Sequence, residues 1–233
     1  MVGLNKIYFG DCLELMQQIP EKSIDFLFTD PPYNISKKNN FMSMQRINKY
    51  RGMDFGEWDK GFDQTKWLEF ALPLLKDDAN ILIFNSWQNL KKISDFLEVN
   101  GIKTKRILVL KKTNPMPVNR DRLFTNSFEF ALWAVKGKWV FNRQNSYETG
   151  FFECKNNGST NHPTEKQVKI IKELLIILSN AGQTILDPFS GSGTMAIACH
   201  DLKRNFVCIE KNLQYYKDAK MRYNSHIAQL SLF

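Results

Sequence analysis

The stretch that decides the fold is Thr184–Glu210, which reads TILDPFSGSGTMAIACHDLKRNFVCIE. A short apolar strand, Thr184–Leu186, runs into a turn rich in glycine and serine, and residues 194–201 then carry a helical pattern. A second apolar strand, Phe206–Ile209, ends at the carboxylate Glu210. This order of strand, turn, helix and strand predicts two parallel strands joined by a helix that covers them.

The turn inside this unit is a candidate binding site for a nucleoside. Gly191, Gly193 and Ala196 fit the pattern GxGxxG/A, in which glycines permit a tight turn and close approach to a ligand. The pattern alone is a weak signal, since a plain strand-to-helix turn also accounts for it. A dinucleotide needs two mononucleotide-binding halves in series, and only 40 of the 233 residues follow Gly193. One half fits a mononucleoside such as adenosine, with Glu210 holding two ribose hydroxyls.

The rest of the chain repeats the alternation of short apolar strands and helical patterns. The expected strands are Lys6–Phe9, Ile24–Thr29, Ile81–Asn85, Arg106–Leu110, Phe128–Val135, Thr184–Leu186 and Phe206–Ile209. The expected helices are Thr65–Leu75, Trp87–Val99, Thr164–Ser179, Thr194–Asp201 and Leu213–Gln229. Thr164 and Gln167 have the spacing of a capping box. The pattern predicts an α/β fold, with a mainly parallel sheet covered by helices on both faces.

Two polar segments, residues 34–61 and 136–161, break this pattern. The first contains five cations, Lys37, Lys38, Arg46, Lys49 and Arg51, before its first acid, Asp54. Loops of this length in a compact domain are usually functional or disordered. We expect one domain, residues 1–233, in which both segments contact a partner and are mobile without it, because nothing in their sequence can anchor them.

Composition narrows the partners of this chain. The formal charge of +8 favours nucleic acid first and an anionic membrane surface second, although a basic soluble protein needs neither. No run approaches the roughly 20 apolar residues of a membrane span. The N-terminus lacks the apolar stretch of a signal peptide, so we expect a cytoplasmic protein without a membrane partner. The four cysteines form no CxxC pair and no histidine stands at ligand spacing, so we expect no metal.

A second motif, Asp30-Pro31-Pro32-Tyr33, directly follows the strand Ile24–Thr29. Average composition gives this tetrapeptide by chance about once in a thousand chains of this length. A rigid turn is the plain alternative. However, ligand sites of α/β sheets lie beyond the carboxyl ends of the strands, which is where this motif stands.

The motif offers what an amino group on a nucleobase needs in order to react. The nitrogen lone pair is delocalised into the ring, and two acceptors on its N–H groups would favour a tetrahedral nitrogen. Asp30 offers a carboxylate, and Pro31 offers a carbonyl that Pro32 keeps extended. Tyr33 offers a flat face on which a base can stack, worth roughly 1–3 kcal/mol.

The stretch Thr29-Asp30-Pro31-Pro32-Tyr33-Asn34 resembles the catalytic loop of the amino-methylating DNA methyltransferases. The resemblance implies a site-specific enzyme that flips the target base out of duplex DNA. It implies that Asp30, Pro31, Pro32 and Tyr33 form the catalytic loop. The DPPY form usually goes with N6-adenine, whereas N4-cytosine enzymes more often begin the motif with serine. An adenine-specific DNA methyltransferase is therefore expected, with N4-cytosine as the alternative.

Three further stretches resemble segments of the same family that bind S-adenosylmethionine. They are DPFSGSGT at 187–194, HPTEK at 162–166, which the family places beside the methionine end, and GDCLE at 10–14. Gln167 stands where the family usually has proline. The cofactor residues that the resemblance implies are Asp11, Cys12, Asp30, His162, Thr164, Lys166, Asp187, Phe189, Ser190, Gly191, Ser192, Gly193, Thr194, Glu210 and Lys211.

The order of the motifs is that of the circularly permuted β class of the family, with the catalytic loop first and the cofactor loop last. This implies a Rossmann-like methyltransferase fold with a seven-stranded, mostly parallel sheet, in which strand 6–9 lies next to strand 206–209. The small size and SFEFALWAVKGK at 127–138 are similar to adenine enzymes of MboII-type restriction systems.

The partner that the resemblance implies is double-stranded DNA, with residues 136–161 as the target-recognition region. A homodimer and a cognate restriction endonuclease are further partners that it allows. The cations expected to bind DNA are Lys37, Lys38, Arg46, Lys49, Arg51, Arg120, Arg122, Lys138 and Arg143.

Other functions explain fewer of these features. A cytosine-C5 methyltransferase needs a nucleophilic cysteine, typically after proline, and no cysteine here follows proline. A nicotinamide oxidoreductase would leave the DPPY loop and the basic segments unexplained. A non-catalytic DNA-binding protein would explain the charge but not both loops. RNA or protein-glutamine methyltransferases use similar NPPY-like loops, but Asp30 and the permuted order favour DNA.

Overall fold

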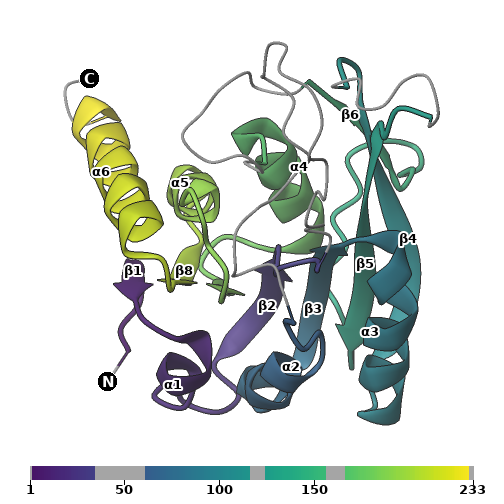
Figure 1. Cartoon of the computed structure of the whole chain (residues 1–233), viewed down its shortest axis with the longest axis horizontal. Coiled ribbons are helices and arrows are strands. Elements are labelled where there is room, and N and C mark those ends of the chain that lie inside the picture. The colour runs from purple at the N-terminus through teal and green to yellow at the C-terminus, as the bar shows by residue number, and fades with distance from the viewer. Residues whose placement is uncertain (1, 35–60, 116–123, 156–165, 231–233) are drawn as a thin grey trace, which may run out of the picture.

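A computed structural model describes residues 2–34, 61–115, 124–155 and 166–230 of the chain. They form one eight-stranded sheet with helices on both faces, and the strand order is β1-β8-β7-β2-β3-β5-β4-β6 (Figure 1). The strands are β1 (Lys6–Phe9), β2 (Ile24–Thr29), β3 (Leu75–Asn85), β4 (Lys103–Lys112), β5 (Phe128–Lys136), β6 (Phe151–Cys154), β7 (Thr184–Asp187) and β8 (Asn205–Glu210). The helices are α1 (Cys12–Met16), α2 (Lys66–Ala71), the 3-10 turn η2 (Leu72–Leu74), α3 (Trp87–Val99), α4 (Val168–Leu178), α5 (Thr194–Asp201) and α6 (Leu213–Leu230).

The sheet is mostly parallel, as the sequence predicts. Only β5 runs against its neighbours, β3 and β4. The N-terminal strand β1 pairs in parallel with β8, so the chain's first strand completes the sheet beside the cofactor loop, as expected. Because β2, β7 and β8 are parallel neighbours, the loops that follow them meet at one edge of the sheet. We call this edge the carboxyl edge.

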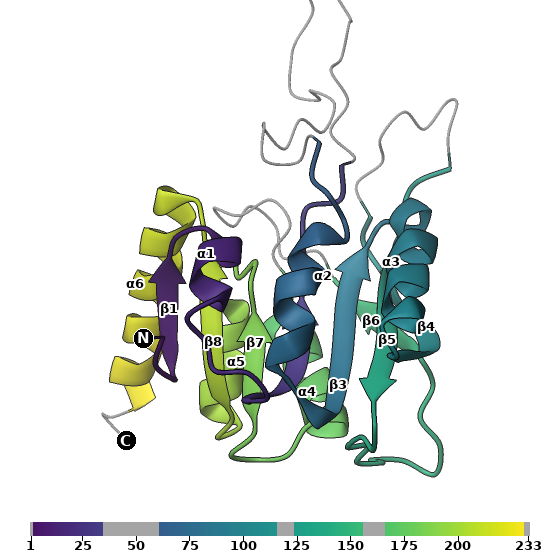
Figure 2. The same ribbon diagram turned by 90° about the horizontal axis from the view of Figure 1, so that it is seen from below.

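The core consists of two apolar layers, one on each face of the sheet. Alternate residues of β3 divide between them: Ile81 and Ile83 join the layer under α1, α2 and α3, whereas Leu82 and Phe84 join the layer under α4 and α5. Figure 2 shows the first three helices on the same side of the sheet. All six residues of β2 are buried, which is what a strand covered on both faces requires.

The sequence misplaced the end of one helix and the start of another. The helix expected over Thr65–Leu75 ends at Ala71, because Pro73 has no N–H to continue it, and the chain makes a 3-10 turn before β3 begins at Leu75. Helix α4 begins at Val168, and its N-cap Gln167 makes no capping hydrogen bond, because its side-chain amide donates to the Lys155 carbonyl. The capping box with Thr164 therefore does not start this helix, and Thr164 itself lies outside the described residues.

The sheet has eight strands and not seven, because β6 lies inside the segment 136–161 that the sequence shows as irregular. Strand β6 has only four residues, FFEC, which is too short for an alternating pattern to stand out. It pairs in parallel with the carboxyl-terminal half of β4. The five-residue helix α1 was likewise missed, and the carboxylate of Asp11 caps it by accepting the backbone N–H of Leu13 at 2.9 Å.

The first part of the segment 136–161 is anchored, contrary to expectation. The side-chain amide of Asn142 donates to the carbonyls of Ile176 at 3.1 Å and Ser179 at 3.0 Å, at the end of α4. The backbone N–H of Lys138 donates to Asp78 at 2.7 Å. These partners lie at the other edge of the sheet from the carboxyl edge. Strand β5 ends there at Lys136, which pairs with Ala79 in the amino-terminal half of β3.

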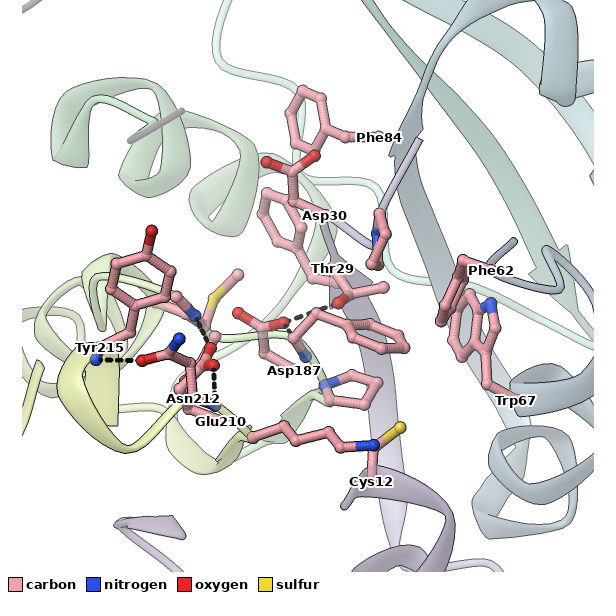
Figure 3. A pocket seen from close by; sticks show the side chains of 18 of the residues that line it. Cys12, Thr29, Asp30, Phe62, Trp67, Phe84, Asp187, Glu210, Asn212 and Tyr215 are labelled. Atoms are coloured by element: carbon pink, nitrogen blue, oxygen red, sulfur yellow. Dashed lines mark hydrogen bonds between the residues drawn. The ribbon is translucent and has the colours of Figure 1, made fainter. Parts of the chain in front are cut away.

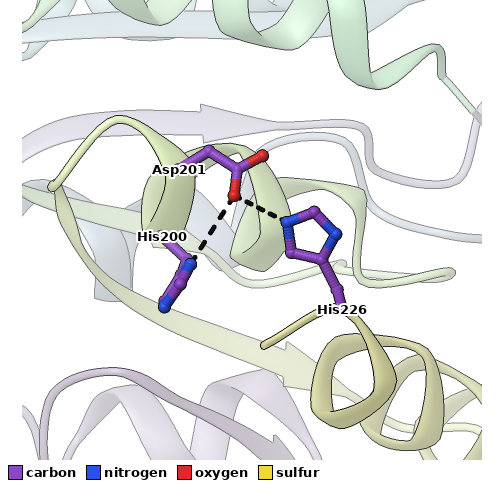
Figure 4. A group of neighbouring side chains, drawn as sticks. All are labelled: His200, Asp201 and His226. Atoms are coloured by element: carbon purple, nitrogen blue, oxygen red, sulfur yellow. Dashed lines mark hydrogen bonds and ion pairs between the residues drawn. The ribbon is translucent and has the colours of Figure 1, made fainter. Parts of the chain in front are cut away.

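Helix α6 is fastened to α5 by a polar group that the sequence did not reveal (Figure 4). Asp201 Oδ1 lies 2.6 Å from His226 Nε2 and 3.6 Å from His200 Nδ1. The ligand atoms of these three side chains lie within 4.8 Å of one another, a spacing at which a metal could join them. However, the Lys172 ammonium of α4 lies 2.6 Å from Asp201 Oδ2 and already balances that charge, so we interpret the group as an ionic clip between three helices.

No helix within the described ranges has the length and apolar character that crossing a bilayer requires.

Candidate active site and cofactor cavity

A cavity of about 840 Å³ opens at the carboxyl edge of the sheet, between the DPPY loop after β2 and the glycine-rich loop after β7 (Figure 3). Asp30 and Asp187 line it from neighbouring strands, and Glu210 lines it from the end of β8. The volume is in the range of pockets that enclose a cofactor-sized ligand. The two motifs that the sequence singled out, more than 150 residues apart, thus share one cavity.

The backbone of the DPPY loop is held by a chain of side-chain amides that sequence reasoning missed. Gln64 donates to the Pro32 carbonyl at 2.8 Å, and Asn85 donates to Gln64 at 2.8 Å. Asn89 donates to the Tyr33 carbonyl at 2.8 Å and to Asn85 at 2.7 Å. Asn85 ends β3 and Asn89 lies in the first turn of α3, so the only sequence signal was polar residues at a strand end.

The Pro31 carbonyl differs from the carbonyls of Pro32 and Tyr33. Within the described part of the chain, no hydrogen-bond donor reaches it, whereas amides engage the next two. A carbonyl held in place by fixed neighbours, and not engaged by those donors, is available to an N–H group of a ligand.

The carboxylate of Asp30 is engaged by two side chains of the free protein. The Tyr33 hydroxyl donates to Asp30 Oδ1, and the Lys166 Nζ lies 2.5 Å from Asp30 Oδ2. Lys166 also reaches the carboxylate of Glu129 at 3.2 Å, and Lys112 pairs with the other oxygen of Glu129. The structure therefore places Lys166, which the resemblance implies beside the cofactor, in the cavity lining and in contact with the DPPY loop.

These charges are strongly coupled because they are largely buried. Burial raises the pKa of the Glu129 carboxyl, but the ammonium groups of Lys166 and Lys112 outweigh it and lower the pKa to about 2. Burial likewise lowers the pKa of Lys166, and the carboxylates of Asp30 and Glu129 more than restore it, so that it stands above its ordinary value. Glu129 and Lys166 are both ionised at neutral pH.

The glycine-rich loop is tied to the carboxylate that ends β8. Glu210 Oε2 accepts the Gly191 N–H at 2.8 Å, and Glu210 Oε1 accepts the Asn212 N–H at 2.7 Å. Burial raises the pKa of Glu210. Gly193 has φ +74°, and a Cβ there would lie 2.9 Å from Ala219 Cβ of α6. Only glycine fits this position, which lets α5 begin close against α6.

Asp187 ends β7 between the two loops and is almost completely buried. The Thr29 hydroxyl donates to Asp187 Oδ1 at 2.7 Å, and the Phe189 N–H donates to the same oxygen at 3.2 Å. Burial raises the pKa of Asp187 to about 7, despite these two hydrogen bonds, which lower it. This carboxyl joins the catalytic strand β2 to the cofactor loop.

The cavity is also lined by aromatic rings and by one ion pair near its surface. The Phe189 ring makes T-shaped contacts with the rings of Phe62 and Trp67, at centroid distances of 5.4 Å and 5.2 Å. Asp11 pairs with Lys211 at 2.7 Å, so two expected cofactor residues from opposite ends of the chain meet. Phe62, Trp67, Asn212 and Tyr215 also line the cavity and carried no sequence motif that could have marked them.

The expected site residues thus fall into four groups. The structure brings together around the cavity Asp11, Cys12, Asp30, Pro32, Lys166, Asp187, Phe189, Ser190, Gly191, Ser192, Thr194, Glu210 and Lys211. Pro31, Tyr33 and Gly193 belong to the loops that form it. Outside the described residues lie Lys37, Lys38, Arg46, Lys49, Arg51, Arg120, Arg122, His162 and Thr164. Lys138 and Arg143 follow β5 and lie toward the opposite edge of the sheet.

A Rossmann-like sheet, a glycine-rich loop tied to an acid that ends the next strand, and a cavity of this size define an S-adenosylmethionine-dependent methyltransferase. The cavity fits this cofactor, because Glu210 lines it and presents two oxygens that can each still accept a ribose hydroxyl. A model of the family described as DNA methylase, which covers N6 and N4 enzymes, matches residues 24–221. The chain belongs to this family.

Individual relatives agree with the family match. The chain is 32% identical to the type II methyltransferase M2.MboI of Moraxella bovis, over 94% of this chain and 87% of that protein. It is 29% identical to the type II methyltransferase M.HinfI of Haemophilus influenzae, over 94% of this chain and 68% of that protein.

Solved structures show the same fold. The M1.HpyAVI–SAM complex superposes with a TM-score of 0.75 at 33% identity, over 93% of this chain and 98% of that one. The cytosine-N4-specific PvuII DNA methyltransferase superposes with a TM-score of 0.71 at 17% identity, over 94% of this chain and 86% of that one. The latter likeness concerns the fold alone, so the comparisons leave the target base open.

Proposed function

We propose that this protein transfers a methyl group to the N6 amino group of a flipped-out adenine at specific sites in duplex DNA, as the modification enzyme of a restriction system. The observation that carries the proposal is that the Asp30 carboxylate lines the cofactor cavity and is followed by the Pro31 carbonyl, while side-chain amides hold the next two carbonyls of the loop in place. The DPPY form of the loop supports adenine.

The roles of the residues follow from the chemistry of a conjugated amine. S-Adenosylmethionine supplies a methyl group on a sulfonium sulfur, which leaves as a neutral thioether. Asp30 and the Pro31 carbonyl accept the two N–H groups, so that the nitrogen lone pair points away from the base toward the cavity. With the cofactor bound, the N–C bond would form as the S–C bond breaks, and the methylated nitrogen would pass one N–H proton to its acceptor Asp30, from which water would take it. Tyr33 provides the face on which the base stacks.

Cofactor roles are proposed for the residues around the cavity. Glu210 accepts the ribose hydroxyls, and the Gly191–Gly193 turn lies against the adenosine. Asp11 lies in the same wall and fits the adenine edge. His162 and Thr164 are expected to contribute on the strength of the HPTEK motif alone.

The DNA lies at the carboxyl edge under this proposal. Described residues beside the ranges 35–60 and 116–123 belong to this edge. Asn34 follows β2, residue 115 follows β4, and residue 124 precedes the antiparallel strand β5. Asn34 and Phe62 are joined by two hydrogen bonds, at 2.6 Å and 2.9 Å. Seven of the nine expected DNA-binding cations lie in these ranges.

The experiment that tests the function is incubation of the protein with plasmid and labelled S-adenosylmethionine, then nucleoside analysis and modification-aware sequencing. N6-methyladenine at one short sequence is the expected product. N4-methylcytosine would keep the chemistry and overturn the base, and an unmodified plasmid would overturn both. Asp30→Ala should abolish labelling while the thermal unfolding midpoint stays near that of the parent; near-normal turnover would exclude the proposed role of Asp30.

A further inference from the structure

The acceptor that the target amine needs is already engaged in the free protein. Asp30 Oδ2 contacts the Lys166 ammonium at 2.5 Å, and Asp30 Oδ1 accepts the Tyr33 hydroxyl. An ammonium on the accepting oxygen competes with an incoming N–H group for the same lone pairs. Entry of the base therefore requires Lys166 to move off Asp30 or to share it.

Lys166 has a second carboxylate within reach. Glu129 Oε2 lies 3.2 Å from the same Nζ, and the Lys166 side chain is only 11% exposed. The Phe84 ring lies beneath, with its centroid 5.0 Å from Nζ, so the ammonium stays over an aromatic face between the two acids. A small rotation of the side-chain end exchanges one carboxylate for the other.

Glu129 is well placed to receive this charge. It lies at the start of β5, and Lys112 of the paired strand β4 binds its other oxygen, so its position does not depend on Lys166. The neighbouring ammonium groups lower the pKa of Glu129 to about 2, so its carboxylate is ionised at neutral pH. Without Glu129, movement of Lys166 off Asp30 would leave an unpaired buried charge, which is costly.

We propose that Lys166 and Glu129 are a place-holding pair for the target amino group: Lys166 occupies Asp30 in the free enzyme and passes to Glu129 when the amine enters. The proposal rests on the proposed role of Asp30 as acceptor. Lys166 and Glu129 are positioning residues, because they act on the amine through Asp30. Lys166 then contributes nothing to cofactor affinity, in contrast to what the HPTEK resemblance implies.

The test compares Glu129→Gln, Lys166→Met and the double variant. Glu129→Gln leaves Lys166 with Asp30 alone, so the single-turnover rate at saturating cofactor and DNA should fall at least tenfold. The dissociation constant for S-adenosylmethionine, measured by calorimetry, should stay within twofold of the parent in all three variants. Adding Lys166→Met to Glu129→Gln should raise the rate again, because the competitor for Asp30 is then gone.

The matched control is Glu153→Gln. Glu153 lies on β6 and pairs with Lys111, the neighbour of Lys112, at 2.9 Å, but it is exposed and does not contact Lys166. It should leave the rate unchanged. Thermal unfolding midpoints of all variants show whether each is folded.

Recovery in the double variant is the result that a structural role for Glu129 would not produce. A double variant no faster than Glu129→Gln would overturn the proposal, as would a Glu129→Gln rate equal to the parent. Weaker cofactor binding by Lys166→Met with an unchanged saturated rate would make Lys166 a cofactor ligand and also overturn it. Asp30→Ala in the same assay separates the two levels: turnover in that variant refutes the acceptor role itself, whatever Glu129→Gln does.

Discussion

At the scale of single residues, the most unusual group is Asp187, a buried carboxyl that joins the catalytic strand to the cofactor loop. Its pKa of about 7 in the folded protein lies above that of the unfolded chain, whose reference value is 3.8. Between these values the folded state binds a proton that the unfolded state does not. The contribution of Asp187 to stability therefore falls as pH rises from about 4 to about 7 and is constant above that window.

Asp187→Asn should remove this pH dependence. The amide oxygen can still accept the Thr29 hydroxyl and the Phe189 N–H, and it carries no charge to desolvate. The free energy of unfolding of the variant minus that of the parent should rise across this window, with a slope no steeper than about 1.4 kcal/mol per pH unit. Urea unfolding at pH 4 to 8 measures it, and parallel curves for the two proteins would show that Asp187 ionises normally.

Gly193 provides the second test at this scale. Gly193→Ala meets both the left-handed conformation and the contact with Ala219 at 2.9 Å, so it should weaken cofactor binding at least tenfold and lower the unfolding midpoint. The matched control is Gly182→Ala, with φ +81° and open space around its Cβ. That change should cost only the left-handed strain, about 1 kcal/mol, and leave cofactor affinity intact. Equal effects of the two variants on affinity, measured by calorimetry, would remove the special role of the α5–α6 approach.

At the scale of elements, the ionic clip at Asp201 joins the helices α4, α5 and α6. Burial raises the pKa of Asp201, but hydrogen bonds from Lys172 and His226 outweigh it, so the pKa in the folded protein is lowered. The stabilisation from Asp201 is therefore present above its unfolded pKa and is lost as pH falls through its folded pKa.

Asp201→Asn should lower the urea midpoint at pH 7, and the effect should shrink toward pH 3, because protonation of the unfolded chain, whose reference pKa is 3.8, removes part of the stabilisation that the folded carboxylate provides. Asp95→Asn is the control, because the exposed Lys91–Asp95 pair within α3 should contribute only about 0.3–0.5 kcal/mol. An Asp201→Asn effect that is the same at pH 7 and pH 3 would mean that shape, and not charge, holds the three helices together.

At the scale of the whole molecule, the net charge of +8 should be expressed as salt-dependent DNA binding at one edge of the sheet. Replacement of Lys37, Lys38, Arg46, Lys49 and Arg51 by alanine should weaken binding to all sequences alike. The slope of log K against log salt should flatten by about 0.9 for each phosphate that the variant no longer neutralises. Fluorescence anisotropy between 50 and 300 mM salt, roughly the range in which such slopes are measured, provides the readout.

Lys138 and Arg143 are the controls for this experiment. The sequence suggested them as DNA contacts, but they lie toward the opposite edge of the sheet, so Lys138→Ala with Arg143→Ala should leave the slope unchanged. A flattened slope in this pair, with none in the five-residue variant, would place DNA on the other side of the molecule.

The sequence by itself determined the architecture and both loops of the site. Local patterns indicate these features: apolar strands at regular intervals, the DPPY tetrapeptide and the glycine-rich turn before Glu210. Such patterns can be recognised from the sequence alone, because they lie in short continuous stretches of the chain. Strand β1 was placed beside β8 by the permuted motif order of the family that the sequence resembles, and the structure confirms this pairing. Helix α4 was given the wrong start, because a capping box that reads well locally can be overridden by the surrounding fold.

Only the tertiary structure decided which side chains serve the loops. Glu129 stands in an apolar strand, and Lys166 ends a motif that resembles a cofactor segment, yet the fold brings Lys166 into contact with both Glu129 and Asp30. The amides of Gln64, Asn85 and Asn89, and the clip at Asp201, are likewise assembled from separate elements. Such groups have no sequence pattern of their own, because their distances are set by how strands and helices pack and not by their spacing along the chain.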